Sequence, residues 1–104
     1  MKQLTINDVT YYIGTNAKDN FAALDAGQPD DIWIHASKIP SCHVIVVNGP
    51  DKKAIRLGAA LCKQNTLKLA NLKNVEFVYT SVKHVVKTSV DGRVIITNEK
   101  TVVV

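Results

Sequence analysis

The chain has 104 residues, of which 46% are hydrophobic and 21% charged, and its formal net charge is +4. This length gives room for one hydrophobic core, and the apolar fraction excludes an intrinsically disordered chain. No apolar stretch approaches the roughly 18 residues of a membrane span, and residues 1–8 lack the apolar segment of a secretion signal. We therefore expect one domain over residues 1–104, located in the cytoplasm and without a membrane partner.

The positive charge lies in the second half of the chain. Residues 1–50 carry three Lys against five Asp, whereas residues 51–104 carry ten Lys and Arg against four Asp and Glu. The halves therefore have net charges of −2 and +6. Such asymmetry favours a polyanionic partner, although spaced lysines also simply keep small domains in solution.

The two cysteines, Cys42 and Cys62, lie among apolar residues and not in a Cys-x-x-Cys pair. A cysteine in such surroundings usually packs as a small hydrophobic side chain. We expect both to be free, structural thiols, which fits a reducing compartment.

The first half of the chain alternates strand and helix signals. Val9–Ile13 is β-branched and aromatic and predicts a strand that ends at Gly14. Asn16 is a good helix N-cap, Asp19 suits the first turn, and Gly27 ends the helix. The expected apolar face of this helix comprises Ala17, Phe21 and Leu24.

Two further strands are predicted at 31–35 and 42–47, joined by a loop that contains Pro40. Side chains alternate along a strand, so Trp33 and His35 share one face, as do His43 and Ile45. A loop of this length permits an antiparallel hairpin, which would bring His35 and His43 together on the Trp33 face.

A second helix is predicted from Asn48-Gly49-Pro50, with Pro50 at its first position and Asp51 in its first turn. Its core stripe consists of Ala54, Gly58, Leu61 and Cys62. The opposite side carries a basic ridge of Lys52, Arg56 and Lys63.

Ten of the last thirty residues are Val, which favours strands. Strands are predicted at 75–80, 82–87, 94–97 and 101–104, with turns at Asp91-Gly92 and 98–100. In the second of these strands, Lys83 and Lys87 are expected to project together. The fold class is therefore α+β: two helices and a mixed, largely antiparallel sheet, with a strand-rich C-terminal third.

Few residue patterns point to catalysis. The sequence has neither a Gly-x-Ser-x-Gly nucleophile elbow nor a glycine-rich phosphate loop followed by Lys and Ser or Thr. Asp30, Asp31, His35 and His43 are residue types that bind metals or move protons, but Asp30 and Asp31 also suit an ordinary turn. The histidine spacing matches no zinc motif, so we expect no metal or cofactor.

Trp33, the single Trp, is expected to anchor the core, and stacking on a base is its alternative role. Phosphate contacts are expected from this basic ridge of Lys52, Arg56 and Lys63 together with Lys83, Lys87 and Arg93, provided that the helix and the later strands share a surface.

Three segments together resemble a known family: Ile13-Gly14-Thr15-Asn16 through Asn20, Asp30-Asp31-Ile32-Trp33-Ile34-His35, and Ile39-Pro40-Ser41-Cys42-His43. The chain resembles the NFACT-R (NFACT RNA-binding) domain, found in the ribosome quality-control factors NEMF and RqcH and in shorter proteins. Tyr79-Thr80, Lys87 and Gly92-Arg93-Val94 fill its later positions. Ser41-Cys42 departs from the family's Gly-Ser, which affects the loop that presents His43.

The resemblance implies RNA or ribosome binding, with Asp31, Trp33, His35 and His43 as signature residues. Our leading expectation is a stand-alone, non-enzymatic domain that binds structured RNA, tRNA or rRNA, on the ribosome in translation quality control. DNA is an alternative polyanion. Two other functions stay open. One is an RNA-acting enzyme or accessory factor in tRNA modification that uses the Asp31/His35/His43 cluster, and the other is a protein-docking module.

Overall fold

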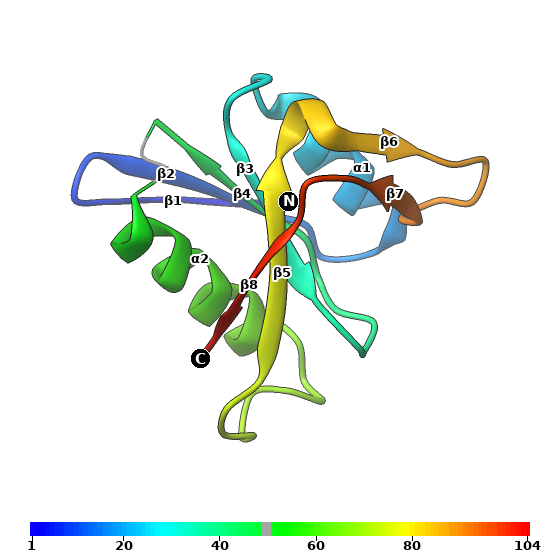
Figure 1. Cartoon of the computed structure of the whole chain (residues 1–104). Helices are drawn as coiled ribbons and strands as arrows, with labels where there is room; N and C mark the ends of the chain where they lie inside the picture. Colours follow the sequence, from blue (N-terminus) through cyan, green and yellow to red (C-terminus); the bar gives the residue numbers. More distant parts are fainter. Residues whose placement is uncertain (49–50) are drawn as a thin grey trace.

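The computed structural model describes residues 1–48 and 51–104, and its strands form one large sheet and one separate hairpin (Figure 1). The six-stranded sheet has the order β1-β2-β4-β3-β5-β8, and β6 pairs with β7. All these pairings are antiparallel. The strands are β1 (Lys2–Ile6), β2 (Val9–Ile13), β3 (Ile32–Ala36), β4 (Val44–Val47), β5 (Glu76–Ser81), β6 (Val85–Lys87), β7 (Val94–Ile96) and β8 (Lys100–Val103).

Two helices, α1 (Ala17–Ala26) and α2 (Lys52–Gln64), cover opposite faces of the large sheet (Figure 1). Even-numbered residues of β3 and β4, such as Ile34 and Val44, pack in one buried cluster with α2. Trp33 and Ile45 face the other way and pack with Leu24 of α1 and with side chains of β6 and β7. The α+β prediction with a largely antiparallel sheet is therefore confirmed.

The start of α1 matches the prediction, but its buried side does not. Asn16 is the N-cap, and its Oδ1 accepts a hydrogen bond from the Asp19 N–H at 2.9 Å. Ala17, predicted to be in the core, is exposed, and Asn20 is buried instead. The reason is polar: the Asn20 amide bonds to the backbone of the neighbouring strand, which an apolar pattern does not reveal.

Helix α2 begins at Lys52, after Asp51, which acts as the N-cap and not as a first-turn residue. The Asp51 Oδ1 accepts from the Ala54 N–H at 2.8 Å. The position predicted for Pro50 lies outside the described residues. The predicted core stripe is confirmed, since all four of its residues are buried: Ala54, Gly58, Leu61 and Cys62.

In the described part of the chain, no helix has the length and apolar content that a membrane span needs.

The edge strand β1 was not predicted from the sequence. It pairs with β2 through a tight turn in which Asn7 (φ 51°) and Asp8 (φ 67°) both adopt left-handed backbone conformations. Such a pair is the geometry of a two-residue hairpin turn, and Asn and Asp tolerate it better than most residues. Four of the five β1 residues are exposed, so no apolar alternation marks the strand.

The strand predicted over residues 82–87 is wrong in its first half. Val82–His84 form a short 3-10 helix, and β6 begins only at Val85. Tertiary hydrogen bonds cause the change, because the Val82 N–H donates to the Asp31 carbonyl and the Lys83 N–H to the Pro29 carbonyl. The chain therefore leaves the large sheet at this point, and Lys83 and Lys87 do not project as neighbours on one strand.

Candidate functional site

The β3–β4 hairpin brings the two predicted histidines together. Trp33 lies opposite Ile45 and Ile34 opposite Val44, which places His35 and His43 beside one another at the loop end of the hairpin. The two imidazole centroids are 4.9 Å apart in an edge-to-face arrangement. The His35 ring also stacks on the Trp33 indole, with a centroid distance of 5.7 Å and an interplanar angle of 11°.

A hydrogen bond from Trp33 determines which nitrogen of the His43 imidazole carries the proton. The indole is 2% exposed and its Nε1–H donates to His43 Nδ1 at 3.1 Å. A nitrogen that accepts this bond carries no proton, so the proton of the neutral imidazole lies on Nε2. Burial, with a smaller contribution from neighbouring His35, lowers the pKa of His43 to about 3. Trp33 therefore acts as a core anchor and its alternative role, direct stacking on a base, is not available in this arrangement.

Burial also lowers the pKa of His35 below its usual value of 6.5. Both imidazoles are therefore neutral at pH 7. Unlike His43, which is 2% exposed, His35 is only partly buried and presents its ring to the surface. The pair forms an aromatic, uncharged surface with polar nitrogens.

The segment after β2 holds His43 from its backbone side. The Gly14 N–H donates to the His43 carbonyl at 2.9 Å, and the His43 N–H donates to Asn20 Oδ1 at 3.0 Å. A Cβ at Gly14 would lie 2.8 Å from Asn20 Cα, a separation that backbone atoms do not tolerate. Glycine is therefore required here so that the Asn20 amide can reach the β4 side of the site.

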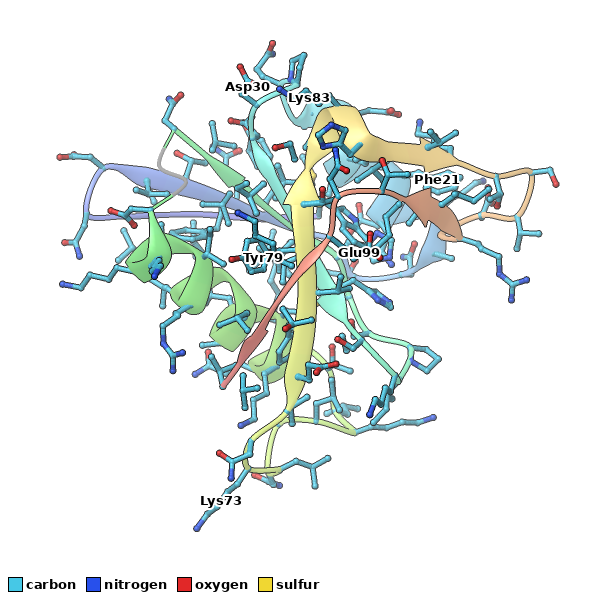
Figure 2. All side chains as sticks on the ribbon, in the orientation of Figure 1. Phe21, Asp30, Lys73, Tyr79, Lys83 and Glu99 are labelled. Atoms are coloured by element: carbon cyan, nitrogen blue, oxygen red, sulfur yellow. The ribbon has the colours of Figure 1, made fainter. Side chains whose placement is uncertain are left out.

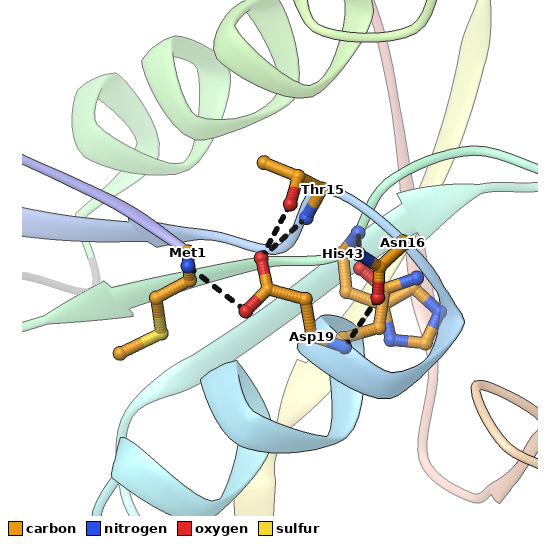
Figure 3. A network of polar contacts seen from close by, with 6 residues as sticks. Met1, Thr15, Asn16, Asp19 and His43 are labelled. Carbon is orange, nitrogen blue, oxygen red and sulfur yellow. Dashed lines mark hydrogen bonds and ion pairs between the residues drawn. The ribbon is translucent and has the colours of Figure 1, made fainter.

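A polar network anchors the start of α1 next to His43 (Figure 3). Asp19 Oδ2 accepts from the Thr15 N–H at 2.8 Å and from Thr15 Oγ1 at 2.6 Å, and the Met1 ammonium pairs with Asp19 Oδ1 at 2.9 Å. These hydrogen bonds from Thr15, together with the Met1 ammonium, lower the pKa of Asp19 to about 2. The network ties the chain before α1 to the helix and so fixes one wall of the site.

These elements line an open pocket of about 900 Å³. Its inner surface includes Trp33, His35, His43, Asn20 and Ser37. Its walls come from the loop between β3 and β4, the start of α1, the segment after α2 and the β6–β7 loop. Gly92 (φ 79°) brings this last loop against α1, since a Cβ there would lie 3.0 Å from Ala17 Cα.

Three exposed cations line the opening of the pocket: Lys38, Lys68 and Arg93. We call them the pocket rim. They come from three separate loops, and Asp91 is the acidic residue in the same lining. The site therefore combines an uncharged aromatic interior with a net positive opening.

Asp31 lies apart from the histidines. Its side chain is buried at the start of β3, where its Oδ2 accepts from the Gln28 N–H at 2.7 Å. His35 is four residues further along the strand, which corresponds to about 13 Å. The hypothesised Asp31/His35/His43 cluster is therefore not formed. Among the described residues, no group of three or more His, Cys, Asp or Glu side chains is placed to hold a metal ion.

The six predicted phosphate-binding residues do not share one surface. Lys52, Arg56 and Lys63, which we call the α2 basic ridge, lie on one side of the large sheet (Figure 1). The segment with Lys83, Lys87 and Arg93 lies on the other side (Figure 1). Lys83 pairs with Asp30 at 2.9 Å, as Figure 2 shows, and Lys87 pairs with Asp25. Lys63 donates to the Val104 carbonyl at 3.2 Å. Of the six, Arg93 is the one that lines the pocket.

The pocket lining includes residues that were not predicted as site residues, among them Ser37, Lys38 and Lys68, whereas Asn20 lies in a segment that carries the family resemblance. Lys38 lies in the loop between the two histidine strands, and this position was a usable signal. No sequence pattern indicated Lys68, because it reaches the pocket from the turn that follows α2. Figure 2 shows Lys73, from the same segment, projecting away from the body of the molecule.

The two cysteines are free and buried, as predicted, but their contact was not foreseen. Cys42 and Cys62 have their sulfur atoms 3.4 Å apart, and the Cys62 thiol donates to the Cys42 carbonyl at 3.0 Å. This contact joins the segment before β4 to helix α2, and Cys42 also lines the pocket.

Comparison with known proteins places these features in context. No family model matches the chain. The chain is 30% identical over 94 residues to Coiled-coil domain-containing protein 25 of Mus musculus, covering 82% of this chain and 45% of that protein. It is also 30% identical over 81 residues to the Rqc2 homolog RqcH of Bacillus subtilis strain 168, covering 76% of this chain and 14% of that protein.

Among solved structures, the C-terminal part of the fibronectin/fibrinogen-binding protein from Streptococcus suis superimposes with a TM-score of 0.89. The match covers 99% of this chain and 44% of that chain at 21% identity, so it establishes a shared fold. The chain spans less than half the length of these relatives. It is therefore similar in sequence to part of RqcH and of Coiled-coil domain-containing protein 25.

Proposed function

We propose that this domain is an NFACT-R-like module that binds RNA through the pocket and its basic rim. The observation that carries the proposal is the convergence of Lys38, Lys68 and Arg93 from separate loops around one aromatic cavity. Cations set around an aromatic surface are the usual means by which proteins hold a nucleic-acid backbone beside its bases. The similarity to RqcH and the sequence resemblance to NFACT-R support the same function.

The finer proposal is a structured RNA, tRNA or rRNA, bound on the ribosome in translation quality control. It rests on the resemblance, because the cations and aromatic rings of the site support a nucleic-acid ligand without favouring one RNA over another. The basic residues on the far side of the sheet are not part of the proposed pocket. The α2 basic ridge would contact phosphates only of an RNA large enough to pass around the domain.

The test compares two sets of charge reversals that change the net charge equally. One replaces the pocket rim (Lys38→Glu, Lys68→Glu, Arg93→Glu), and the other replaces three exposed α2 cations (Lys52→Glu, Lys53→Glu, Arg56→Glu). Lys63 is spared because its ammonium contacts the Val104 carbonyl. Fluorescence anisotropy with labelled tRNA measures the affinity, and circular dichroism shows that each variant is folded.

We expect the rim variant to bind tRNA at least tenfold more weakly and the α2 variant to stay within threefold of the original chain. Equal losses would mean that net charge alone drives binding. Unchanged binding by the rim variant would contradict the proposed surface, and no binding of any RNA by the original chain would favour the protein-docking alternative. A DNA hairpin of the same sequence, measured in parallel, shows whether the site selects RNA.

A further inference from the structure

The inside of the pocket differs in character from its opening. The opening carries exposed ammonium and guanidinium groups, whereas the interior is lined by aromatic rings and neutral polar groups. Both imidazoles are uncharged at pH 7, for the reasons given above. A phosphate therefore gains most at the rim, while a flat, uncharged, polar group fits the interior better.

The interior holds polar groups that have no partner among the described residues. The Nε2–H of His43 has no hydrogen-bond acceptor, and neither has the side-chain NH₂ of Asn20, whose Oδ1 is already used by the His43 N–H. Ser37 Oγ is buried without any hydrogen-bond partner. Of these groups, Ser37 Oγ is the fully buried one. Because buried polar groups are nearly always satisfied, this unpaired hydroxyl indicates a ligand that supplies its partner, and the free N–H groups of His43 and Asn20 are further donors in the same pocket.

The His35 ring is also held in position for stacking before a ligand binds. One face of the His35 ring is supported by the buried Trp33 indole, so the imidazole is held in a fixed plane. A ring held in this way offers a stacking platform without the cost of ordering it on binding. The volume of about 900 Å³ is large enough for a nucleotide-sized ligand. A base pair within a helix cannot enter, because both of its faces are already stacked.

We propose that the pocket takes a single unpaired nucleobase of the bound RNA, extruded from the strand or at its end. This inference rests on the RNA-binding function proposed above and specifies what the site recognises. The base stacks on His35, the carbonyl or ring-nitrogen acceptors of its edge bind His43 and Asn20, and its flanking phosphates meet the rim. A free mononucleotide offers the same chemistry, so the experiment separates these two sources.

The experiment uses three RNA probes built on one hairpin. The first is blunt, the second carries a single-stranded 3′ overhang of four nucleotides, and the third carries the same overhang with abasic sugars in place of the bases. The second and third probes have the same phosphates and differ only in the bases. Anisotropy gives the affinity of the original chain and of the variants His35→Ala and His35→Phe for each probe.

We expect the overhang to bind about tenfold more tightly than the blunt hairpin, and the abasic overhang to lose most of this gain, because stacking of one base on an aromatic ring contributes about 1–3 kcal/mol. His35→Ala should abolish the difference between the overhang and abasic probes, and His35→Phe should restore it. A separate titration with a mononucleotide follows the fluorescence of Trp33, the single Trp in the chain.

The outcomes distinguish the two proposals. Equal affinity for all three probes, still dependent on the rim, would overturn the base pocket and leave RNA binding intact. Loss of all RNA binding would overturn both. A mononucleotide that binds more tightly than the overhang would overturn the RNA strand as the source of the base, and weaker binding of the mononucleotide would support it.

Discussion

At the scale of the residue, His43 connects the stability of the domain to its site. Its Nδ1 accepts the Trp33 N–H and its backbone binds both Gly14 and Asn20, so its environment is fixed on several sides. His43 Nδ1 accepts the bond from Trp33 only while the imidazole is neutral. The residue therefore serves the fold and the pocket through the same protonation state.

This dependence predicts a loss of stability in mild acid. The pKa of His43 is about 3 in the folded chain and 6.5 without the protein environment, so between these values the unfolded state binds more protons. The free energy of unfolding should fall as the pH drops from 6.5 towards 3, by at most about 1.4 kcal/mol per pH unit. Burial lowers the pKa of His35 too, so it contributes with the same sign.

The variant His43→Asn tests this prediction, because its Oδ1 replaces Nδ1 as the acceptor for Trp33 and does not titrate. Urea unfolding at pH 7 and pH 4.5 should show a smaller pH dependence in the variant than in the original chain. Asp19, whose pKa falls from 3.8 to about 2 in the fold, loses its contribution below about pH 5, but it is present in both chains and so does not affect their comparison. An identical pH dependence in both chains would mean that His43 titrates with the same pKa in the folded and unfolded states.

At the scale of the element, α2 depends on a close approach to the sheet. A Cβ at Gly58 would lie 2.7 Å from Ile34 Cδ1 and 2.9 Å from Val46 Cγ2, and both side chains are fully buried. Glycine thus allows the helix backbone to rest on the strands that also carry the pocket on their opposite face. Close packing there keeps β3 and β4 in a fixed position.

Gly58→Ala should therefore destabilise the domain. Overpacking costs about 1–3 kcal/mol, and the better helix propensity of alanine returns at most about 1 kcal/mol. The midpoint of urea unfolding measures the net loss. Lys53→Ala, on the exposed side of the same helix, is the control and should change stability by no more than about 0.5 kcal/mol. A more stable Gly58→Ala variant would show that α2 can move away from the sheet.

The elements that could be predicted from the sequence are those whose neighbours in the chain determine them. The Asn16 cap, the core stripe of α2 and the histidine pair of the β3–β4 hairpin depend on local periodicity and turn chemistry. The 3-10 helix at Val82–His84 does not, because hydrogen bonds to residues around Pro29 and Asp31 create it. Strand β1 escaped prediction because an exposed edge strand needs no apolar pattern.

The candidate site divides in the same way. Its histidines were predicted because one hairpin carries both, whereas the rim required knowledge of which loops meet. Arg93 and Lys68 reach the pocket through tertiary packing of the β6–β7 loop and of the turn after α2. Charge counted along the chain placed the positive residues in its second half but did not reveal that they occupy two opposite sides of a sheet.

At the scale of the whole molecule, the split charge predicts a modest dependence of RNA binding on salt. Each phosphate contact with a single strand contributes about −0.7 to the slope of log affinity against log salt concentration. Contacts from the three rim cations alone give a slope of about −2, and contacts from both sides of the sheet would make it about twice as steep. Anisotropy titrations over a roughly sixfold range of salt concentration, from about 50 to about 300 mM, distinguish these two slopes. A slope near zero would contradict a phosphate contact of any kind.

The position of β3 in the middle of the sheet also affects how the domain folds. β3 pairs on one side with β4, which follows after a short loop, and on the other with β5, where His35 lies opposite Val78, 43 positions further along. Pairings between distant parts of a chain form slowly because the intervening loop must first be closed. During synthesis, the histidine hairpin is available early, while the wall that carries Arg93 is added only after the last third has emerged. The pocket therefore needs the last third of the chain, and a chain that lacks it would hold the hairpin but not the complete binding surface.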